Sequence, residues 1–192
     1  MSKTLLNDVV TIKLGLNLSR KSEEEKKYIN IYTNNDLIND LDTIDYEEGQ
    51  DNRVEENNAI IHTVHRGDLV YSFINSISGI VGKANGGKII NQNFAKIEID
   101  ENRIDKKYLC YLLNSDKEIN REKDIAMQGS VLKKLSPTAI RNFEVELPDI
   151  DRQKKIGNLY ATWIRRKALI KKRNELEDII FSEFLNDLKM QH

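Results

Sequence analysis

The residues best suited to chemistry lie in the glycine-rich segment 82–88, Gly-Lys-Ala-Asn-Gly-Gly-Lys. Its spacing matches a phosphate loop, but Ile89 stands where that motif requires a Ser or Thr to bind magnesium. The Asn-Gly step is also typical of a tight hairpin turn, so the segment is expected to join two short strands. A turn that exposes Lys83, Asn85 and Lys88 suits a nucleic-acid backbone better than a triphosphate pocket.

Residues that usually carry catalysis or bind metals occur here without the partners they need. His62 and His65 have the spacing of a metal-binding pair, but no third ligand is near in sequence, so they are interpreted as structural or surface histidines. Cys110 lies in an apolar helical pattern and is expected to be a buried, inert thiol. The sequence contains no Gly-x-Ser-x-Gly motif and no methyltransferase motif. It therefore predicts a chain that is not an enzyme and that binds no cofactor or metal itself.

Composition limits the class of protein. The chain has 192 residues, of which 39% are apolar and 32% charged, and this suits one compact domain with an appendage. No stretch reaches the roughly 18 consecutive apolar residues of a membrane span. The first residues lack the apolar run of a secretion signal, and a single cysteine excludes an internal disulfide. These features predict a soluble, cytoplasmic protein without membrane contact.

Residues 1–148 are predicted to form a mixed, strand-rich domain that positions the polar segments. The predicted strands are short and apolar, at 9–14, 69–73, 80–81, 89–90, 94–99 and 143–147. A helix is predicted over 105–114, and a short helical turn begins where Ser136 precedes a proline. Segment 20–58 is expected to be a long polar loop with short helices or strands inside it, and segment 115–135 is expected to be another polar loop.

Residues 149–192 are predicted to contain one long helix. Asp149 or Asp151 can cap its start, and no proline follows Pro148. About 37 helical residues would span roughly 55 Å, more than the width of the preceding domain, so part of the helix should project. Its apolar residues form two stripes, one for its own domain and one for a partner helix. The residues expected on the partner helix interface are Ile156, Tyr160, Trp163, Ile170, Leu176, Ile180, Phe184 and Leu188.

Charge is balanced in total but unevenly distributed. The chain has 30 basic and 31 acidic residues, yet residues 152–173 contain nine bases and no acid. Such a basic stripe is typical of a solvated helix face, of a surface that binds an acidic protein, or of a surface that approaches DNA phosphates. Charge alone leaves these three interpretations open.

Seven short motifs follow one another along the chain: 67–72 (Gly-Asp-Leu-Val-Tyr-Ser), 79–83 (Gly-Ile-Val-Gly-Lys), 90–93 (Ile-Asn-Gln-Asn), 108–109 (Tyr-Leu), 128–130 (Gln-Gly-Ser), 143–148 (Phe-x-Val-x-Leu-Pro) and 153–156 (Gln-Lys-Lys-Ile). This ordered set resembles the target recognition domain and spacer helix of the specificity subunit of type I restriction-modification systems. Family members commonly have Glu-Gln where this chain has Arg152-Gln153. Full-length members contain two recognition domains and two spacer helices, so this chain resembles a half-subunit.

The resemblance implies an α+β fold in which a DNA recognition domain, 1–148, is followed by a spacer and dimerisation helix, 149–192. Amide side chains can pair with adenine, and Lys and Arg hold phosphates. The residues expected to bind DNA are Arg20, Lys21, Lys83, Asn85, Lys88, Gln128, Ser130, Lys133 and Lys134.

The resemblance also implies the partners. They are double-stranded DNA, a second copy of the chain, a methyltransferase subunit that would bind S-adenosylmethionine, and a restriction subunit. Two copies joined by their helices would each read one half of a palindromic, bipartite site. The alternative is a coiled-coil assembly module with no DNA contact, whose basic stripe serves an acidic partner. The salt dependence of DNA binding distinguishes the two.

Overall fold

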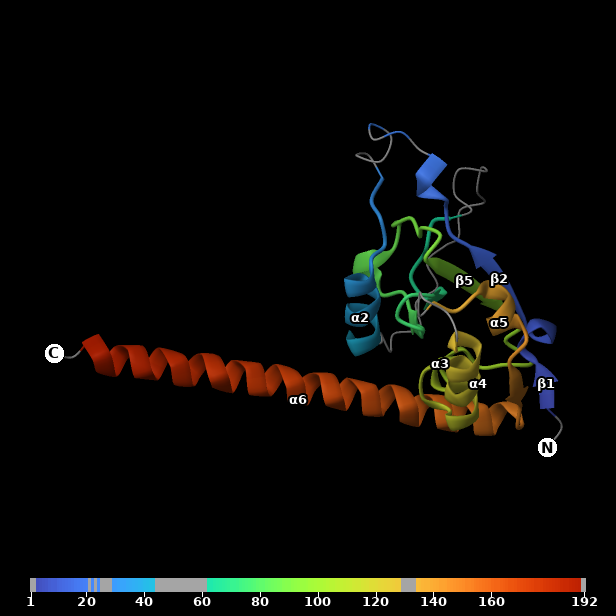
Figure 1. Cartoon of the computed structure of the whole chain (residues 1–192). Helices are drawn as coiled ribbons and strands as arrows, with labels where there is room; N and C mark the ends of the chain where they lie inside the picture. Colours follow the sequence, from blue (N-terminus) through green and yellow to red (C-terminus); the bar gives the residue numbers. More distant parts are fainter. Residues whose placement is uncertain are drawn as a thin grey trace.

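A body of strands and short helices lies on one end of a long C-terminal helix, and the rest of that helix projects away from the body (Figure 1). The computed structural model describes residues 3–20, 22, 24, 29–43, 62–128 and 134–190. The elements in chain order are β1 (Lys3–Leu5), η1 (Leu6–Asp8), β2 (Val10–Leu14), η2 (Leu18–Arg20), α2 (Asn34–Thr43), β3 (Leu69–Ser72), β4 (Ile77–Ile80), η4 (Lys83–Asn85), β5 (Phe94–Ile99), α3 (Lys106–Ser115), α4 (Lys117–Met127), α5 (Pro137–Arg141), β6 (Glu144–Glu146) and α6 (Ile150–Met190). The predicted α+β fold with a long final helix is confirmed.

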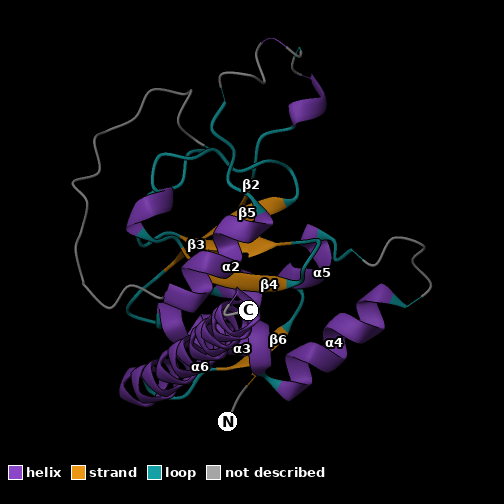
Figure 2. Ribbon diagram, turned by 90° about the vertical axis from the view of Figure 1, so that its left-hand side faces the viewer, coloured by secondary structure: helices purple, strands orange, loops and turns teal. Residues whose placement is uncertain are grey.

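A four-stranded antiparallel sheet with strand order β2-β5-β3-β4 forms the centre of the body. Strand β5 pairs with β2 on one side, from Val10 opposite Ile99 to Leu14 opposite Ala95, and with β3 on the other. Helix α2 packs against the edge strand β4 (Figure 2). A second sheet joins β1 to β6, just before α6 begins. This small sheet brings the two ends of the body together at the start of the long helix.

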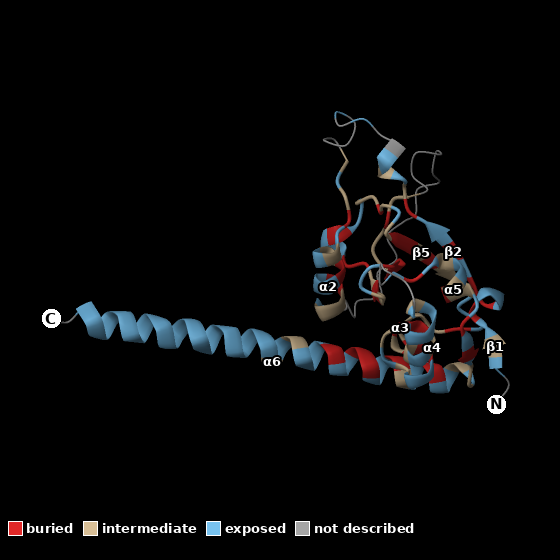
Figure 3. Ribbon diagram, viewed as in Figure 1, coloured by how far each residue is buried: buried red, intermediate tan, exposed pale blue. Residues whose placement is uncertain are grey.

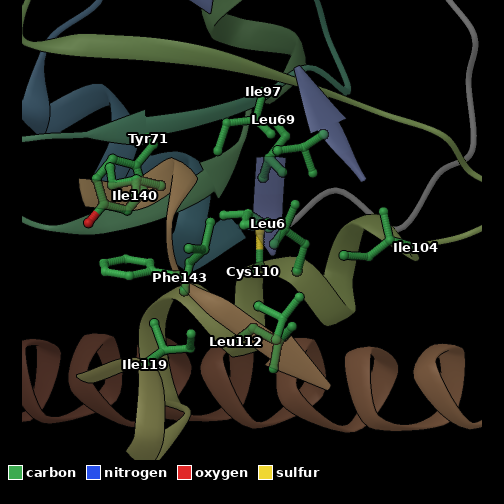
Figure 4. Close-up of a cluster of buried hydrophobic side chains, with 14 of the residues drawn as sticks. Leu6, Leu69, Tyr71, Ile97, Ile104, Cys110, Leu112, Ile119, Ile140 and Phe143 are labelled. Atoms are coloured by element: carbon green, nitrogen blue, oxygen red, sulfur yellow. The ribbon is translucent and has the colours of Figure 1, made fainter. Parts of the chain in front are cut away.

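The central sheet is covered on both faces, so all four residues of β3 are buried. Leu69 and Tyr71 belong to the larger core, which lies between the sheet, α3, α5 and the first half of α6 (Figure 4). Val70 points the other way, as strand alternation requires, into a smaller core with Tyr32 and Leu37. Buried residues of α6 lie only in its first half (Figure 3). That half is therefore part of the body.

Helix starts follow the capping residues that the sequence indicates. The Asp105 carboxylate accepts a hydrogen bond from Tyr108 N, the Ser136 hydroxyl from Ala139 N and the Asp149 carboxylate from Arg152 N. Segment 115–135 differs from its prediction, because α4 forms where a polar loop was expected. Asp116 caps α4, and only Ile119 and Lys123 of the helix are buried, so its apolar pattern is weak.

Lys123 anchors α4 to the rest of the body. Its Nζ donates to the backbone oxygens of Ser76, at 2.7 Å, and Leu113, and it lies 5.8 Å from the centre of the Tyr71 ring. The side chain is buried, and this burial lowers the pKa of Lys123 to about 8, although the charge of Asp124 opposes the shift. Lys123 therefore titrates within an accessible pH range.

The Lys123 anchor predicts a pH-dependent stability. The lysine keeps its ordinary pKa of 10.5 in the unfolded chain, so between about pH 8 and 10.5 the unfolded state binds more protons than the folded state. The free energy of unfolding should therefore rise over this range, relative to the Lys123→Met variant, by about 2–3 kcal/mol at most. Urea unfolding at pH 7 and pH 10 measures the difference. The exposed Lys117→Met variant is the control, and an identical pH slope in wild type and Lys123→Met would contradict the prediction.

Candidate nucleic-acid interface and partner helix

The end of the body farthest from α6 is built from two segments that are distant in sequence (Figure 1). Leu16 N donates to Ile90 O at 2.8 Å, and Gln92 N donates to Leu16 O at 2.9 Å. Gly15 permits this close approach, since a Cβ at that position would lie 2.6 Å from the oxygen of Ile90. The two segments therefore form a hydrogen-bonded framework from which side chains can be presented.

Amides and a lysine gather on this framework. Gln92 Oε1 accepts from Leu18 N at 2.9 Å, and Lys134 Nζ donates to Asn93 Oδ1 at 2.9 Å. We term the set Asn17, Ser19, Gln92, Asn93 and Lys134 the polar end. Its mixture of amide, hydroxyl and ammonium groups is typical of surfaces that contact base edges and phosphates.

The residues predicted from sequence to contact DNA lie in different places in the structure, and their contacts with DNA stay predictions. Lys134 belongs to the polar end, and Arg20 is the last residue of η2. Gln128 is exposed at the C-terminal end of α4. Lys21, Ser130 and Lys133 lie outside the described residues.

Segment 82–88 does not form the predicted hairpin. The strand before it, β4, pairs with β3, whereas Ile89 forms bridges to Ile31 and Thr63. The turn is tied to α2, because Asn85 Nδ2 donates to Asp40 Oδ1 at 2.7 Å. The hairpin prediction is therefore wrong, because the buried hydrogen bond between Asn85 and Asp40 fixes this turn against α2.

Asn85 itself is buried with its amide engaged, so the prediction that it lies on an exposed tip is wrong. It shares a polar cluster with Tyr32, whose hydroxyl donates to Asp40 Oδ2 at 2.7 Å. Burial raises the pKa of Asp40, and hydrogen bonds from Tyr32 and Asn85 oppose that shift. This cluster fixes α2 to the turn and presents no group for a base to contact.

The two lysines of this turn differ in their surroundings. Lys83 is exposed, whereas Lys88 Nζ lies 2.9 Å from Asp36 Oδ1 in a half-buried ion pair. Burial alone would raise the pKa of Asp36, but hydrogen bonds from Lys88 and Thr33 hold it below its ordinary value. Lys83 is thus available for a phosphate contact, while Lys88 would first have to leave Asp36.

Helix α6 presents different faces along its length. The residues buried against the body are Gln153, Gly157, Tyr160, Ala161 and Ile164, which share one face. Tyr160 is buried in the core, so its predicted place on the partner interface is wrong, whereas Ile156 is only partly buried against the core and its place there stays a prediction. Trp163 is half exposed, with the Arg166 guanidinium 5.3 Å from its ring centre.

Beyond Ile170 every described residue of α6 is exposed, and four of the apolar ones recur at a regular interval. Leu176, Ile180, Phe184 and Leu188 follow one another at intervals of four residues and are about half exposed or more. The opposite face carries Glu175, Asp178, Ser182, Asn186 and Lys189. A row of bulky apolar residues on a projecting helix indicates a surface that another helix covers.

The described residues offer little for catalysis or metal binding. They contain no group of three or more His, Cys, Asp or Glu side chains that could hold a metal ion. His62 Nδ1 lies 3.1 Å from the oxygen of Leu14. Cys110 is buried in the core, as predicted, and burial raises the pKa of its thiol to about 12. In the same part of the chain, no helix is long and apolar enough to cross a bilayer.

Three amides of the polar end were given no role by the sequence reasoning, namely Asn17, Gln92 and Asn93. The sequence does mark this turn, because three consecutive residues, Asn91-Gln92-Asn93, carry amide side chains. Its hydrogen bonds to residues 16–18, over seventy positions away in the chain, are what show that the turn belongs to the same surface as the start of η2.

The recognition body, its polar end and the projecting helix correspond to a known class of protein. Residues 2–178 match the family model described as the type I restriction modification DNA specificity domain. The chain belongs to this family. Among curated proteins, no relative matches it.

Solved structures of specificity subunits have the same fold. The S subunit of the type I restriction-modification system from M. genitalium is 12% identical, with a TM-score of 0.62 over 97% of this chain and 45% of that one. The HsdS subunit from Thermoanaerobacter tengcongensis is 14% identical, with a TM-score of 0.53 over 90% of this chain and 39% of that one. The chain thus spans less than half the length of these subunits.

Proposed function

We propose that this chain is the DNA-recognition subunit of a type I restriction-modification system and reads one half of a bipartite site. The observation that carries the proposal is the arrangement of its two surfaces, since the polar end and the projecting apolar row lie on separate parts of the molecule. One surface suits DNA and the other suits protein. An assembly module without DNA contact is not favoured, because the family match extends over the whole recognition body.

A second copy supplies the other half-site in this proposal. The apolar row of α6 would pack against the same row of a partner in a two-fold symmetric contact. Each body would then hold its polar end against DNA at a fixed distance from the other. The site would be palindromic, because identical bodies read both halves.

The chemistry comes from other subunits. A methyltransferase subunit, carrying S-adenosylmethionine, would dock on the body and on α6 and modify the DNA that the polar ends select. A restriction subunit would join the same complex in the cytoplasm, where the cell's DNA lies. The chain itself acts in this proposal without catalysis and without a bound cofactor.

Methylation mapping tests the proposed function directly. Methylated adenines are mapped in cells with the gene for this chain and in cells without it. The expected result is that one bipartite, palindromic motif loses its methylation when the chain is absent. An unchanged methylation pattern would contradict the proposal.

A salt titration tests the proposed phosphate contacts. DNA binding by the complex with the methyltransferase subunit is measured at several salt concentrations. The slope of log K against log salt is negative, and each lost phosphate contact should reduce its magnitude by about 0.9. Lys134→Ala and Lys83→Ala are each expected to give this change, whereas Lys154→Ala, an exposed residue of α6, should not. Binding that is absent or insensitive to salt would favour the assembly module.

A further inference from the structure

The exposed amide side chains of the polar end share one orientation, in which the amide oxygen is bonded to the protein. Gln92 Oε1 accepts a hydrogen bond from Leu18 N at 2.9 Å. Asn17 Oδ1 accepts one from Ser19 N at 3.1 Å and another from the Ser19 hydroxyl. Both oxygens therefore have a donor of the chain itself, and the NH2 groups are the parts of these amides left for a ligand.

The two half-buried amides beside them are arranged in the same way. Asn91 Oδ1 accepts from Asn93 N at 2.8 Å, and Asn93 Oδ1 accepts from Lys134 Nζ at 2.9 Å. Within the part of the chain that the structure describes, none of these four amides donates a hydrogen bond through its NH2 group. Segments 15–19 and 90–93 also contain no Asp or Glu. The surface thus presents hydrogen-bond donors, while its amide oxygens are already engaged.

Gln92 and Asn17 are the two exposed members of this group, and they lie side by side. Gln92 N donates to Leu16 O at 2.9 Å, and the Gln92 side chain accepts from Leu18 N, so Gln92 contacts the chain on both sides of Asn17. Turning the Gln92 amide over would exchange its oxygen and nitrogen and place an NH2 group against the Leu18 N–H. The internal hydrogen bond therefore determines that the donor end of the amide is the end available to a ligand.

This orientation limits which base edge the surface can contact. In the major groove guanine offers two acceptors, N7 and O6, thymine offers one acceptor beside a methyl group, and cytosine offers a donor. An amide that reads adenine donates to N7 and accepts from N6 at the same time, so its oxygen must face the base. The oxygens of Gln92 and Asn17 are bonded within the chain. Guanine is therefore the base whose edge matches these donors best.

We infer that Gln92 and Asn17 read a guanine in the major groove through their amide NH2 groups, and that they are specificity-determining residues for one position of the half-site. The inference rests on the proposed function, since a base is read only if the polar end meets DNA. Lys134 supplies the positive charge of this surface and would hold a neighbouring phosphate. The pairing with adenine that amide side chains otherwise favour does not apply to these two residues.

The test uses the complex of the full chain with the methyltransferase subunit, and DNA in which each base pair of one half-site is varied in turn. Relative methylation of the four bases at each position is measured. Wild type should prefer guanine at one position by about tenfold or more. Gln92→Glu keeps an oxygen that accepts from Leu18 N but replaces the donor by an acceptor. The preference at that position should therefore change from guanine to cytosine, whose N4 amino group is a donor.

Two further variants separate the loss of a donor from the gain of a charge. Gln92→Ala removes the donor and adds no charge, so it should reduce the preference for guanine at the same position by about tenfold without creating a preference for cytosine. Asn39→Asp is the matched control, because Asn39 is exposed on α2 and the substitution makes the same change from amide to carboxylate. It should leave every base preference as in wild type.

An equal loss of methylation for all four bases in Gln92→Glu and Gln92→Ala would overturn the inference, because it would show that Gln92 contacts phosphates alone. A wild-type half-site in which no position prefers guanine would overturn it as well. Failure of the proposed function looks different, since wild type would then methylate no bipartite site.

Discussion

Replacing Ile180 and Phe184 together with aspartate is expected to convert the proposed dimer to a monomer. Both side chains are exposed in the single chain, at 65% and 59%, and lie on the apolar row of α6. Burial of a large apolar side chain is worth about 1.5–3 kcal/mol, and a two-fold contact loses each one twice. The loss of four such side chains removes about 6–12 kcal/mol, which lowers dimer affinity by at least about ten-thousandfold.

Sedimentation measurements across a concentration series give this affinity. Asn186→Asp is the matched control, because it adds a charge on the polar face of the same helical turn and should leave the dimer intact. The free energy of unfolding of the body should not change, since neither Ile180 nor Phe184 touches the core. Methylation of the bipartite site should be lost together with the dimer. A double variant that remains a dimer would show that another surface joins the copies.

The elements that could be predicted from sequence are those whose pattern is local and strong. Strand β5 alternates apolar and polar residues and begins and ends at the predicted residues, Phe94 and Ile99. Helix α6 was predicted from its length without proline and its acidic cap at Asp149. In both cases neighbouring residues are sufficient to determine the structure, so no distant partner needs to be known.

The features that were missed depend on contacts between distant residues. Asn85 was predicted to lie at the exposed tip of a turn. Its side-chain amide is instead buried, because it donates a hydrogen bond to Asp40, which is 45 positions away in the chain. Tyr160 looked like part of a partner interface, but Asn114, 46 positions away, binds its hydroxyl within the body. Polar and amphipathic side chains can lie either in the buried interior or on the surface, so the sequence pattern alone does not determine which of the two they occupy. The same applies to the polar end, which exists only because residues 16–19 meet residues 90–93.

Helix α6 also predicts the orientation of the dimer through its charges. Residues 165–173 contain six bases and no acid, and residues 175–187 contain five acids and no base. A parallel pair would place like charges together, whereas an antiparallel pair would place each basic block against an acidic block of the partner. Charged residues that flank a helix interface select orientation in this way. An antiparallel dimer is therefore expected, with the helices crossing near Asn174.

Disulfide cross-linking measures this orientation. Aligning the basic block with the acidic block places Leu169 of one copy opposite Ile180 of the other, so a mixture of Leu169→Cys and Ile180→Cys chains should form a heterodimeric disulfide. Ile180→Cys alone should not cross-link, because two copies of residue 180 would lie about 16 Å apart along the helices, beyond the roughly 7 Å that a disulfide spans between Cα atoms. The background is low, since the single native cysteine, Cys110, is buried. Efficient cross-linking of Ile180→Cys to itself would establish a parallel dimer and show that apolar packing outweighs the charge pattern.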